Sequence, residues 1–378
     1  MRIPFNIPLV NGREPDYIRE AIANRHLAGN GPFTARCHSW LQQRLGVEKV
    51  LLTHSCTAAL EMAAMLADVG DGDEVIMPSF TFVSTANAFV LRRATPVFVD
   101  IREDTCNLDE SLIEEAITPR TKALAVVHYA GVGCNMDPIL EVARRHGLLV
   151  IEDAAQGLLS TYRDRPLGTL GDLAAVSFHE TKNVVAGEGG ALLVNQARWV
   201  ARSEILWEKG TNRAQFYRGE TDRYTWIDVG SSYLPSEINA AFLLAQLEAA
   251  HAITEQRLAV WRRYHDAFDA WERKGVLRRP IVPSTCRHNG HLYYLLFADL
   301  SHRTAVQSAL RRAGIDAVFH YVPLHSSPAG RKYGRAARPL PVTDSTADRL
   351  LRLPVWAAMT AGDVEFVADT VSQALVAV

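Results

Sequence analysis

The chain of 378 residues is longer than one hydrophobic core usually supports, so we expect two domains. Its composition is ordinary, with 48% hydrophobic and 22% charged residues, and 40 basic against 42 acidic side chains give a formal net charge of -2. This balance indicates neither a nucleic-acid nor a membrane partner. No stretch has the apolar core of a signal peptide or the roughly 18 apolar residues of a membrane span, so a cytoplasmic location is expected.

The five cysteines are odd in number and scattered along the chain. No pair of them has the Cys-x-x-Cys spacing that marks many zinc sites and redox motifs. We therefore expect reduced cysteines that take part in packing, with no disulfide framework and no bound metal.

Short apolar runs alternate with helical patterns in the first half of the chain. The runs predict seven strands, at 49–55, 74–79, 95–101, 122–129, 148–153, 173–178 and 191–195. Most are apolar almost throughout, as strands covered on both faces are. Between the first five strands, stretches such as 56–70 and 136–147 place apolar residues three or four apart and end at glycine. This βαβ series predicts an α/β fold with a mostly parallel seven-stranded sheet.

The last two predicted strands are separated by about a dozen residues, three of which are glycines. A full crossover helix barely fits into that length, because a parallel connection needs a dozen residues or more. We therefore expect these two strands to be antiparallel or joined by an unusual loop.

The second half of the chain predicts long helices over residues 196–275, and two prolines in 278–285 mark a boundary or hinge. A small α+β region is expected after it. Its predicted elements are strands near 291–300 and 316–323, a helix near 304–314, a loop over 325–344 and a final helix from residue 361. We assign a large domain to residues 1–250 and a small C-terminal domain to residues 251–378.

A candidate anion site follows the first strand. The sequence THSCTAALEMAAM predicts a strand, a turn of small residues and then a helix. The amides near Cys56, Thr57 and Ala58 would point toward an anion, with the helix dipole behind them. The same residues also fit a simple Ser/Thr cap of the helix, and the sequence leaves both interpretations open.

Two charged residues are expected at the same edge of the sheet. Asp153 ends a buried strand, at the edge where open α/β sheets bind ligands, and it would either pair with a cation or cap the following turn. Lys182 follows the next strand. An anion site, a carboxylate and an amine together meet the requirements of pyridoxal phosphate (PLP), which needs partners for its phosphate, its ring nitrogen and its aldehyde.

The motifs SCTAAL, EDAAQ and SFHETKN, in this order, resemble the sugar aminotransferases of the DegT/DnrJ/EryC1/StrS family. These enzymes adopt the aspartate aminotransferase fold, fold type I, and the resemblance covers nearly the whole chain. It implies that Lys182 forms an imine with PLP, that Asp153 contacts the pyridinium nitrogen and that Gln156 lies beside the ring. Lys182 and Asp153 are therefore the expected catalytic residues.

The resemblance also implies that Phe82 stacks on the ring and that Ser177 joins Cys56 and Thr57 around the phosphate. Family members commonly have glycine in place of Cys56, so this side chain fits only with a negative φ or when it points away from the phosphate. Many members borrow an asparagine from the neighbouring subunit where this chain has Ser232. A homodimer with shared active sites is therefore implied, in which the shorter serine would reach the phosphate through water.

The family implies a nucleotide-linked keto sugar as the amino acceptor. The stretches 224–237 and 319–334 look most like the branch that aminates C4 of dTDP-4-keto-6-deoxyglucose with L-glutamate as donor, giving a dTDP-4-amino-4,6-dideoxyhexose. His320, His325 and the basic loop at Arg331 are the candidate substrate-binding residues, and structural histidines with a solvated loop are the alternative.

Four alternative functions compete with this one. Amination at C3 by the same family stays open. The sugar-dehydratase branch of the family replaces the lysine by histidine, and a nicotinamide-dependent oxidoreductase would need a GxGxxG motif after the first strand, which is absent. A non-catalytic regulator on the same fold is disfavoured because no helix-turn-helix or basic arm is appended and the cofactor residues remain.

Overall fold

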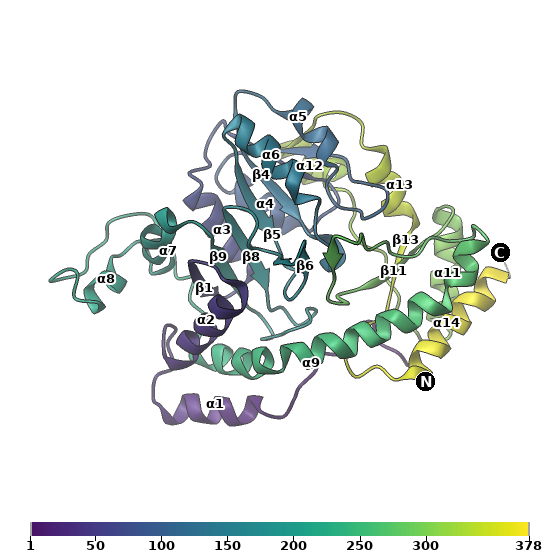
Figure 1. The fold of residues 1–378 in the computed structure, drawn as a ribbon, viewed down its shortest axis with the longest axis horizontal. Helices are drawn as coiled ribbons and strands as arrows, with labels where there is room; N and C mark the ends of the chain where they lie inside the picture. The colour runs from purple at the N-terminus through teal and green to yellow at the C-terminus, as the bar shows by residue number, and fades with distance from the viewer. Residues whose placement is uncertain (1, 377–378) are drawn as a thin grey trace.

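In the computed structural model, which describes residues 2–376, the central element is an eight-stranded sheet (Figure 1). The strands lie in the order β1 (Lys49–Thr53), β9 (Gly190–Val194), β8 (Leu173–Ser177), β5 (Leu149–Asp153), β4 (Thr121–Val127), β2 (Glu74–Pro78), β3 (Thr95–Val99) and β12 (Arg335–Ala336). All seven predicted strands are confirmed to within two residues at each end. The eighth strand, β12, comes from the C-terminal part of the chain and was not predicted.

The sheet is parallel except at β9. This strand runs antiparallel to both of its neighbours, β1 and β8, while β8, β5, β4, β2 and β3 pair in parallel. The predicted antiparallel arrangement of the last two strands is thus confirmed. Because β8 and β9 form a hairpin, the loop between them emerges at the same edge as the carboxyl end of β5.

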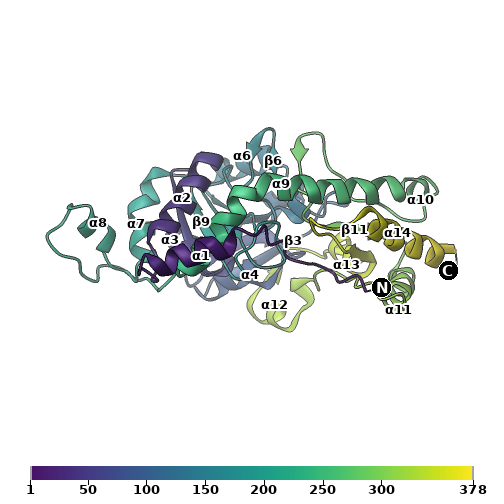
Figure 2. The same ribbon diagram turned by 90° about the horizontal axis from the view of Figure 1, so that it is seen from below.

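Helices cover both faces of the sheet (Figure 2). Alternate residues of one strand face opposite sides. Leu192 of β9 packs in a cluster with α3 (Cys56–Leu66), whereas the next residue, Leu193, packs in a cluster with α2 (Pro32–Leu45) and α9 (Glu237–Ala267). The remaining helices before residue 220 are α1 (Glu14–Ala23), α4 (Val83–Val90), α5 (Ile113–Ala116), α6 (Met136–His146), α7 (Val200–Trp207) and α8 (Arg213–Tyr217).

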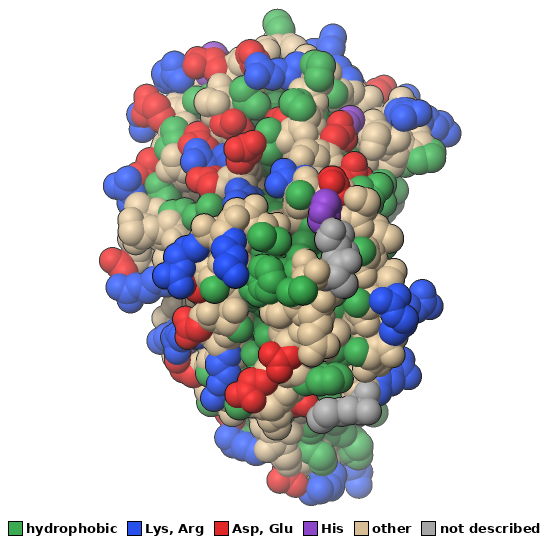
Figure 3. All heavy atoms as spheres, turned by 90° about the vertical axis from the view of Figure 1, so that its right-hand side faces the viewer, with side chains coloured by type: hydrophobic (Ala, Val, Ile, Leu, Met, Phe, Trp, Pro, Cys, Tyr) green, Lys and Arg blue, Asp and Glu red, His purple; other side chains and the backbone are tan. Residues whose placement is uncertain are grey.

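The C-terminal part has a core of its own around a two-stranded antiparallel sheet of β11 (Tyr293–Leu296) and β13 (Leu350–Leu353). Its helices are α10 (Asp269–Arg273), α11 (Leu300–Arg312), α12 (Pro328–Tyr333), α13 (Pro341–Arg349) and α14 (Ala361–Val376), and a small sheet joins β10 (Cys286–Arg287) to β6 (Thr161–Tyr162) and β7 (Arg165–Pro166). The predicted final helix from residue 361 is confirmed. On the face of the molecule shown in Figure 3, basic and acidic side chains are interspersed.

Three predictions for the second half of the chain are wrong. The segment 316–323 forms only an isolated bridge, between Val318 and Arg352, because its following residues turn into the wall of a cavity. The supposed loop 325–344 contains α12, β12 and the start of α13, since both of its helices begin at a proline, a residue favoured at the first helical position. Residues 208–236 hold only the short helix α8, because glycines with positive φ interrupt the segment.

Helix α9 connects the two cores. Its first half packs against the large sheet and its second half packs in the C-terminal core, so the helix runs unbroken across residue 250 (Figures 1 and 2). The division at residue 250 stays a prediction. None of the helices between residues 2 and 376 has both the length and the apolar character needed to span a membrane, and the cytoplasmic location also stays a prediction.

Candidate active site

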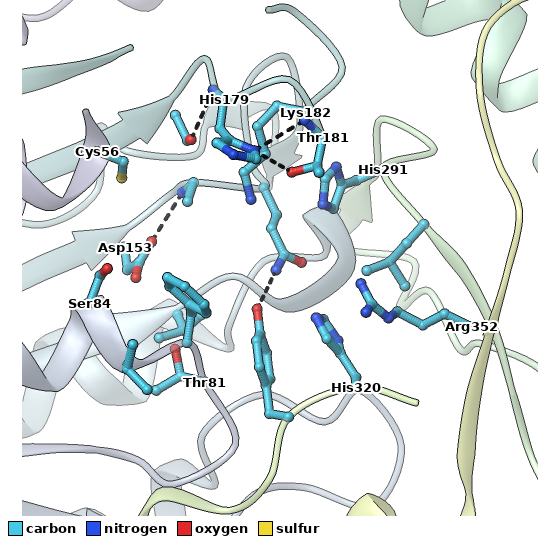
Figure 4. A pocket seen from close by; sticks show the side chains of 18 of the residues that line it. Cys56, Thr81, Ser84, Asp153, His179, Thr181, Lys182, His291, His320 and Arg352 are labelled. Carbon is cyan, nitrogen blue, oxygen red and sulfur yellow. Dashed lines mark hydrogen bonds between the residues drawn. The ribbon is translucent and has the colours of Figure 1, made fainter. Parts of the chain in front are cut away.

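A cavity of about 800 Å³ lies between the carboxyl edge of the large sheet and the C-terminal part (Figure 4). Eight of the predicted site residues line it: Cys56, Thr57, Phe82, Asp153, Gln156, Ser177, Lys182 and His320. They come from five separate segments of the chain. The parallel strand order brings these segments to one place, as expected for the edge of an open α/β sheet.

One end of the cavity is the N-terminus of α3. Ser55 caps this helix, with its hydroxyl accepting a hydrogen bond from Ala58 N at 3.1 Å, so the capping interpretation is correct. The amides of Cys56 and Thr57 have no hydrogen-bond partner among residues 2–376, and both residues line the cavity. The capped helix therefore also offers free amides to an anion.

The backbone around Cys56 shows how a side chain replaces the usual glycine there. Cys56 is the first helical residue of α3 and is not among the residues with positive φ, so the side chain causes no backbone strain. The backbone of Cys56 lies close to β9, and the residue of β9 that faces it is a glycine. A Cβ on this residue, Gly190, would clash because it would lie 2.4 Å from Cys56 N. Burial, together with the nearby Asp153 carboxylate, raises the pKa of the Cys56 thiol, so this group stays neutral.

Asp153 is the last residue of β5, and it is buried beneath the cavity. Its Oδ2 accepts a hydrogen bond of 2.6 Å from the Thr85 hydroxyl, and its Oδ1 accepts one of 3.2 Å from Ala155 N. Among the described residues no cation pairs with this carboxylate within salt-bridge distance. A buried carboxylate held in place without a cation is suited to the protonated nitrogen of a bound ring.

Lys182 lies in the loop between β8 and β9, and its half-buried side chain lines the cavity. Hydrogen bonds across the loop hold it in place: Phe178 N donates to Gly189 O at 2.9 Å, and Glu180 N donates to Gly187 O at 2.8 Å. Burial lowers the pKa of the Lys182 amine, and the positive charge of Arg352 lowers it further. A larger fraction of the amine is therefore neutral and nucleophilic than in an exposed lysine.

Gln156 and Phe82, which were predicted to contact the cofactor, also line the cavity. Gln156 accepts a hydrogen bond from Ala130 N at 2.7 Å and donates one to the Tyr321 hydroxyl at 2.9 Å, which holds its amide beside the cavity. Phe82 lies at the start of α4 with 58% of its surface exposed. An aromatic ring this exposed on a cavity wall is free to stack on a planar ligand.

The C-terminal wall of the cavity carries residues that sequence reasoning missed: Arg257, His291, Tyr321 and Arg352. Arg352 interrupts the apolar run LLRLPV, and a charge within such a run is a signal that could have found it, whereas Arg257 follows the polar residues of ITEQ and has no such signal. His320, which was predicted, lies 2.7 Å from the Tyr129 hydroxyl through its Nδ1. Burial and the charge of Arg352 lower the pKa of His320, which keeps it neutral.

Three predicted residues lie outside the cavity of this chain. Ser232 forms an isolated bridge with Glu208 near the base of the segment that carries α8. The His325 imidazole is 2.8 Å from the Ser79 hydroxyl through Nδ1 and 3.4 Å from the Asp344 carboxylate through Nε2. Arg331 lies on the surface, on α12. The proposed substrate or cofactor contacts of these three residues stay predictions.

The residues of the cavity fit PLP. The free amides of α3 suit its phosphate, the buried Asp153 suits its ring nitrogen, the exposed Phe82 ring suits its aromatic face and the Lys182 amine suits its aldehyde. All four features line one cavity.

Comparison with known proteins gives the following. A model of the DegT/DnrJ/EryC1/StrS aminotransferase family matches residues 10–372. The GDP-perosamine synthase of Caulobacter vibrioides is 35% identical over 382 residues, which cover 99% of each chain. The aminotransferase TlmJ from Streptoalloteichus hindustanus has 30% identity and a TM-score of 0.92, with 100% of each chain covered. The PLP form of the putative sugar aminotransferase Spr1654 from Streptococcus pneumoniae has 25% identity and a TM-score of 0.91, covering 100% of this chain and 99% of that one.

Proposed function

This chain belongs to the DegT/DnrJ/EryC1/StrS aminotransferase family, and on that premise we propose that it transfers an amino group from L-glutamate to C4 of dTDP-4-keto-6-deoxyglucose. The product would be a dTDP-4-amino-4,6-dideoxyhexose. The coarser function needs no proposal, because the family and its structural relatives are PLP-dependent sugar aminotransferases of fold type I. The observation that carries the proposal is the convergence of Lys182, Asp153 and the open amides of α3 in one cavity.

The residues of the sheet edge would hold the cofactor. Lys182 would bind its aldehyde, Asp153 its ring nitrogen, and Thr57, Ser177 and the free amides of α3 its phosphate. When bound, PLP supplies an aldehyde that carries the amino group and a ring that stores the electrons released at the reacting carbon.

The side chains of the cavity then move the protons. With its pKa lowered by burial, the Lys182 amine would move a proton from Cα of the donor to the cofactor in the first half-reaction, and from the cofactor to C4 of the sugar in the second. The Thr85 hydroxyl donates a hydrogen bond of 2.6 Å to Asp153 Oδ2 and would hold this carboxyl group toward the ring. The neutral His320 on the opposite wall adds no charge that would oppose this transfer.

Support for the sugar comes from the segment 319–322, which lines the cavity next to Lys182. Phe319 is 49% exposed and Val322 is 62% exposed, so the mouth of the cavity presents apolar surface. Such a surface suits the methyl group of a 6-deoxy sugar, while the charged nucleotide extends outward to solvent. The same stretch carries the resemblance to enzymes that aminate C4.

A GDP-linked sugar is the second candidate. The observation that favours it is the 35% identity to a relative whose name, GDP-perosamine synthase, points to a GDP-linked product. One experiment can determine both the nucleotide of the substrate and the sugar carbon that is aminated, since each candidate gives a different product.

The test is incubation of the PLP-loaded protein with L-glutamate and each of three acceptors, followed by NMR of the product. The acceptors are the dTDP-linked and GDP-linked 4-keto-6-deoxy sugars and the dTDP-linked 3-keto isomer, with a Lys182→Ala variant as control. We expect nitrogen on C4 of the dTDP sugar and no turnover of the 3-keto isomer. A product with nitrogen on C3 contradicts the proposed amination at C4. A preference for the GDP-linked sugar contradicts the proposed dTDP nucleotide. The absence of product from all three contradicts the proposed function.

We also propose a homodimer with shared active sites, in which the segment 208–236 contacts the partner subunit. This segment, called the arm here, projects away from the body of the molecule around α8 (Figures 1 and 2). It exposes large apolar side chains to solvent, with Trp226 76%, Ile227 50% and Val229 57% exposed. Exposed apolar surface of this kind marks an interface, and a partner's cavity is where the resemblance places Ser232.

Mixed dimers test this arrangement. A Lys182→Ala chain and a Ser232→Glu chain are each expected to be inactive alone, because the second would repel the cofactor phosphate. If Lys182 of one chain and Ser232 of the other complete one site, the mixed dimer keeps one intact site of its two, and about half of the wild-type activity returns. Sedimentation that shows an active monomer, or mixed dimers without activity, contradicts the proposal.

A further inference from the structure

Lys182 depends on its neighbours for its position whenever its amine is not bonded to the cofactor. Backbone hydrogen bonds hold the base of the lysine loop, residues 178–189, at Phe178 and Glu180. Beyond them the half-buried side chain of Lys182 has a flexible stem that can take several rotamers. The place of the amine in the cavity is therefore set by what holds the tip of the loop.

Asn183, the residue after Lys182, joins the tip of the lysine loop to the C-terminal part. Its side chain is buried and reaches the segment between β10 and β11, where its Nδ2 donates a hydrogen bond of 2.8 Å to Asn289 O. Because a carbonyl oxygen can only accept, this bond fixes the orientation of the Asn183 amide. Its Oδ1 then accepts a hydrogen bond of 3.0 Å from Nδ1 of His291, which lines the same cavity as Lys182 (Figure 4).

Asn289 joins the same segment to the edge of the large sheet. It is 1% exposed, and its Nδ2 donates to Gln156 O and to Leu158 O, both at 2.8 Å. Its Oδ1 accepts a hydrogen bond of 3.0 Å from His291 N. Asn183, Asn289 and His291, called the clamp here, therefore connect the lysine loop, the C-terminal wall and the turn that follows β5.

The other side-chain contacts of the lysine loop differ from the clamp because they are exposed. Asn6 Nδ2 donates to Glu180 O, and Asn239 Nδ2 donates to Glu188 O, each at 3.1 Å and at the surface. Water competes for such bonds, whereas breaking a bond of the clamp leaves a buried polar group without a partner. The clamp therefore holds the loop more firmly than these exposed contacts do.

We propose that Asn183 is a positioning residue, which holds the Lys182 amine at the place from which it reacts. The clamp keeps the lysine loop at a fixed distance from the C-terminal wall while the amine is free. Once the amine is bonded to the cofactor, the covalent link itself holds it and the clamp contributes little. This inference rests on the proposed role of Lys182, and it holds for any sugar that the cavity accepts.

The lysine loop has anchors that do not depend on the Asn183 side chain. Val184, the next residue, is 2% exposed and packs in the cluster with α2 and α9. The hydrogen bonds at the base of the loop join backbone atoms. Asn183→Ala should therefore lose the connection to the C-terminal part while the loop itself stays folded.

The attachment of PLP to the cofactor-free protein tests the proposal, because Lys182 is free in that state. Stopped-flow absorbance gives the saturating rate of attachment and the PLP concentration that gives half of this rate. In Asn183→Ala we expect the saturating rate to fall about tenfold, since misplacing a reacting group by about 1 Å can cost up to about 10²-fold. The half-saturating concentration should not change. Asn239→Ala, which removes an exposed hydrogen bond to the same loop, is the matched control and should change neither quantity.

Two results of this experiment overturn the proposal. One is a saturating rate in Asn183→Ala equal to that of the wild type. The other is a higher half-saturating concentration at an unchanged rate, which is the result expected if Asn183 only supports the cofactor site.

Two variants of His291 test the clamp from its other end. His291→Asn keeps an N–H near the place of Nδ1, so the bond to Asn183 Oδ1 can still form, whereas His291→Leu removes the donor. We expect a saturating rate within about threefold of the wild type for His291→Asn and about tenfold lower for His291→Leu. Equal rates in the two variants overturn the proposal. This pair decides the question even if Asn183→Ala does not fold.

Lys182→Ala separates this inference from the proposed role of Lys182. If PLP attaches to Lys182→Ala as fast as to the wild type, the role of Lys182 fails and this inference fails with it. If attachment is lost in Lys182→Ala but is as fast in Asn183→Ala as in the wild type, this inference alone fails. Attachment does not involve the sugar, so a protein that attaches PLP as expected but aminates no sugar contradicts the proposed function and leaves this inference standing.

Discussion

The two walls of the cavity differ in how their charges are balanced. On the sheet wall, formed by the ends of β1, β5 and β8, the Asp153 carboxylate lies near the Lys182 amine, and hydrogen bonds hold both this carboxylate and the backbone of the lysine loop. On the C-terminal wall, His291 and His320 are neutral, and Arg352 has no acidic partner among residues 2–376. The sheet wall suits covalent and proton-transfer chemistry, and the C-terminal wall suits a ligand that carries a negative charge.

This difference follows from where each wall comes from. The sheet wall is placed by strand ends, so its residues keep their positions whatever ligand enters. The C-terminal wall is placed by β11, β13 and the segment between them, packed on a separate core. Substitutions on the sheet wall should therefore affect both half-reactions, while substitutions on the C-terminal wall should affect one.

The largest effect is expected from Lys182→Ala. This variant loses both the covalent attachment and the group that moves the proton, so turnover should fall by about 10⁴-fold with either substrate. Single-turnover kinetics of each half-reaction measure it, with Lys274→Ala, a change at the end of α10, as the control. Turnover within tenfold of the wild type would end the assignment of Lys182.

Asp153→Asn comes next. It should retain the cofactor but slow both half-reactions by about 10²- to 10³-fold, because an amide does not stabilise the charge of the ring nitrogen. Deuterium at Cα of glutamate should give a larger isotope effect in this variant as proton transfer becomes slower. Single-turnover rates equal to those of the wild type would show that Asp153 serves only to cap the turn.

Thr85→Val tests the support beneath Asp153. The change removes the hydrogen bond of 2.6 Å to Asp153 Oδ2 and leaves a buried carboxylate oxygen short of a donor, which costs about 1–3 kcal/mol. We expect a fall in both half-reactions of about tenfold together with a lower unfolding midpoint. Thr370→Val, on the exposed side of α14, should change neither quantity. An effect on the donor half-reaction alone would contradict the division between the two walls.

The smallest effect is a change with pH. Because burial lowers the pKa of Lys182, the rate at which PLP attaches to the cofactor-free protein should rise with pH and level off below the ordinary lysine pKa. The positive charge of Arg352 contributes to this lowering, so Arg352→Gln should move the midpoint to higher pH. Stopped-flow absorbance across the pH range measures the midpoint for the wild type and for Arg352→Gln. Identical midpoints would show that there is no electrostatic interaction between the two walls.

Much of the sheet wall could be predicted from the sequence. Seven apolar runs predicted seven strands, and the rule that parallel strands end at one edge brought Asp153 and Lys182 together. The motif resemblance then added Gln156 and Phe82, which do line the cavity. These predictions succeeded because each depends on local patterns.

The C-terminal wall was harder to predict. Arg352 and His291 reach the cavity only through the packing of β11 against β13, and β13 itself was not predicted. His325 was expected at the substrate, but its imidazole is engaged by Ser79, a contact between segments far apart in the sequence. Patterns of a single segment carry no information about such pairings.

The most direct test of the account is the position of the covalent link to PLP. The chain has six lysines, all of them within the described residues, and Lys182 is the one that lines the cavity. Borohydride reduction of the PLP-loaded protein, followed by peptide mass spectrometry, should find the pyridoxyl group on the peptide that contains Lys182. The group should be absent from every peptide of the Lys182→Ala variant. A pyridoxyl group on any of the other five lysines of the wild type, or on none, would contradict the account.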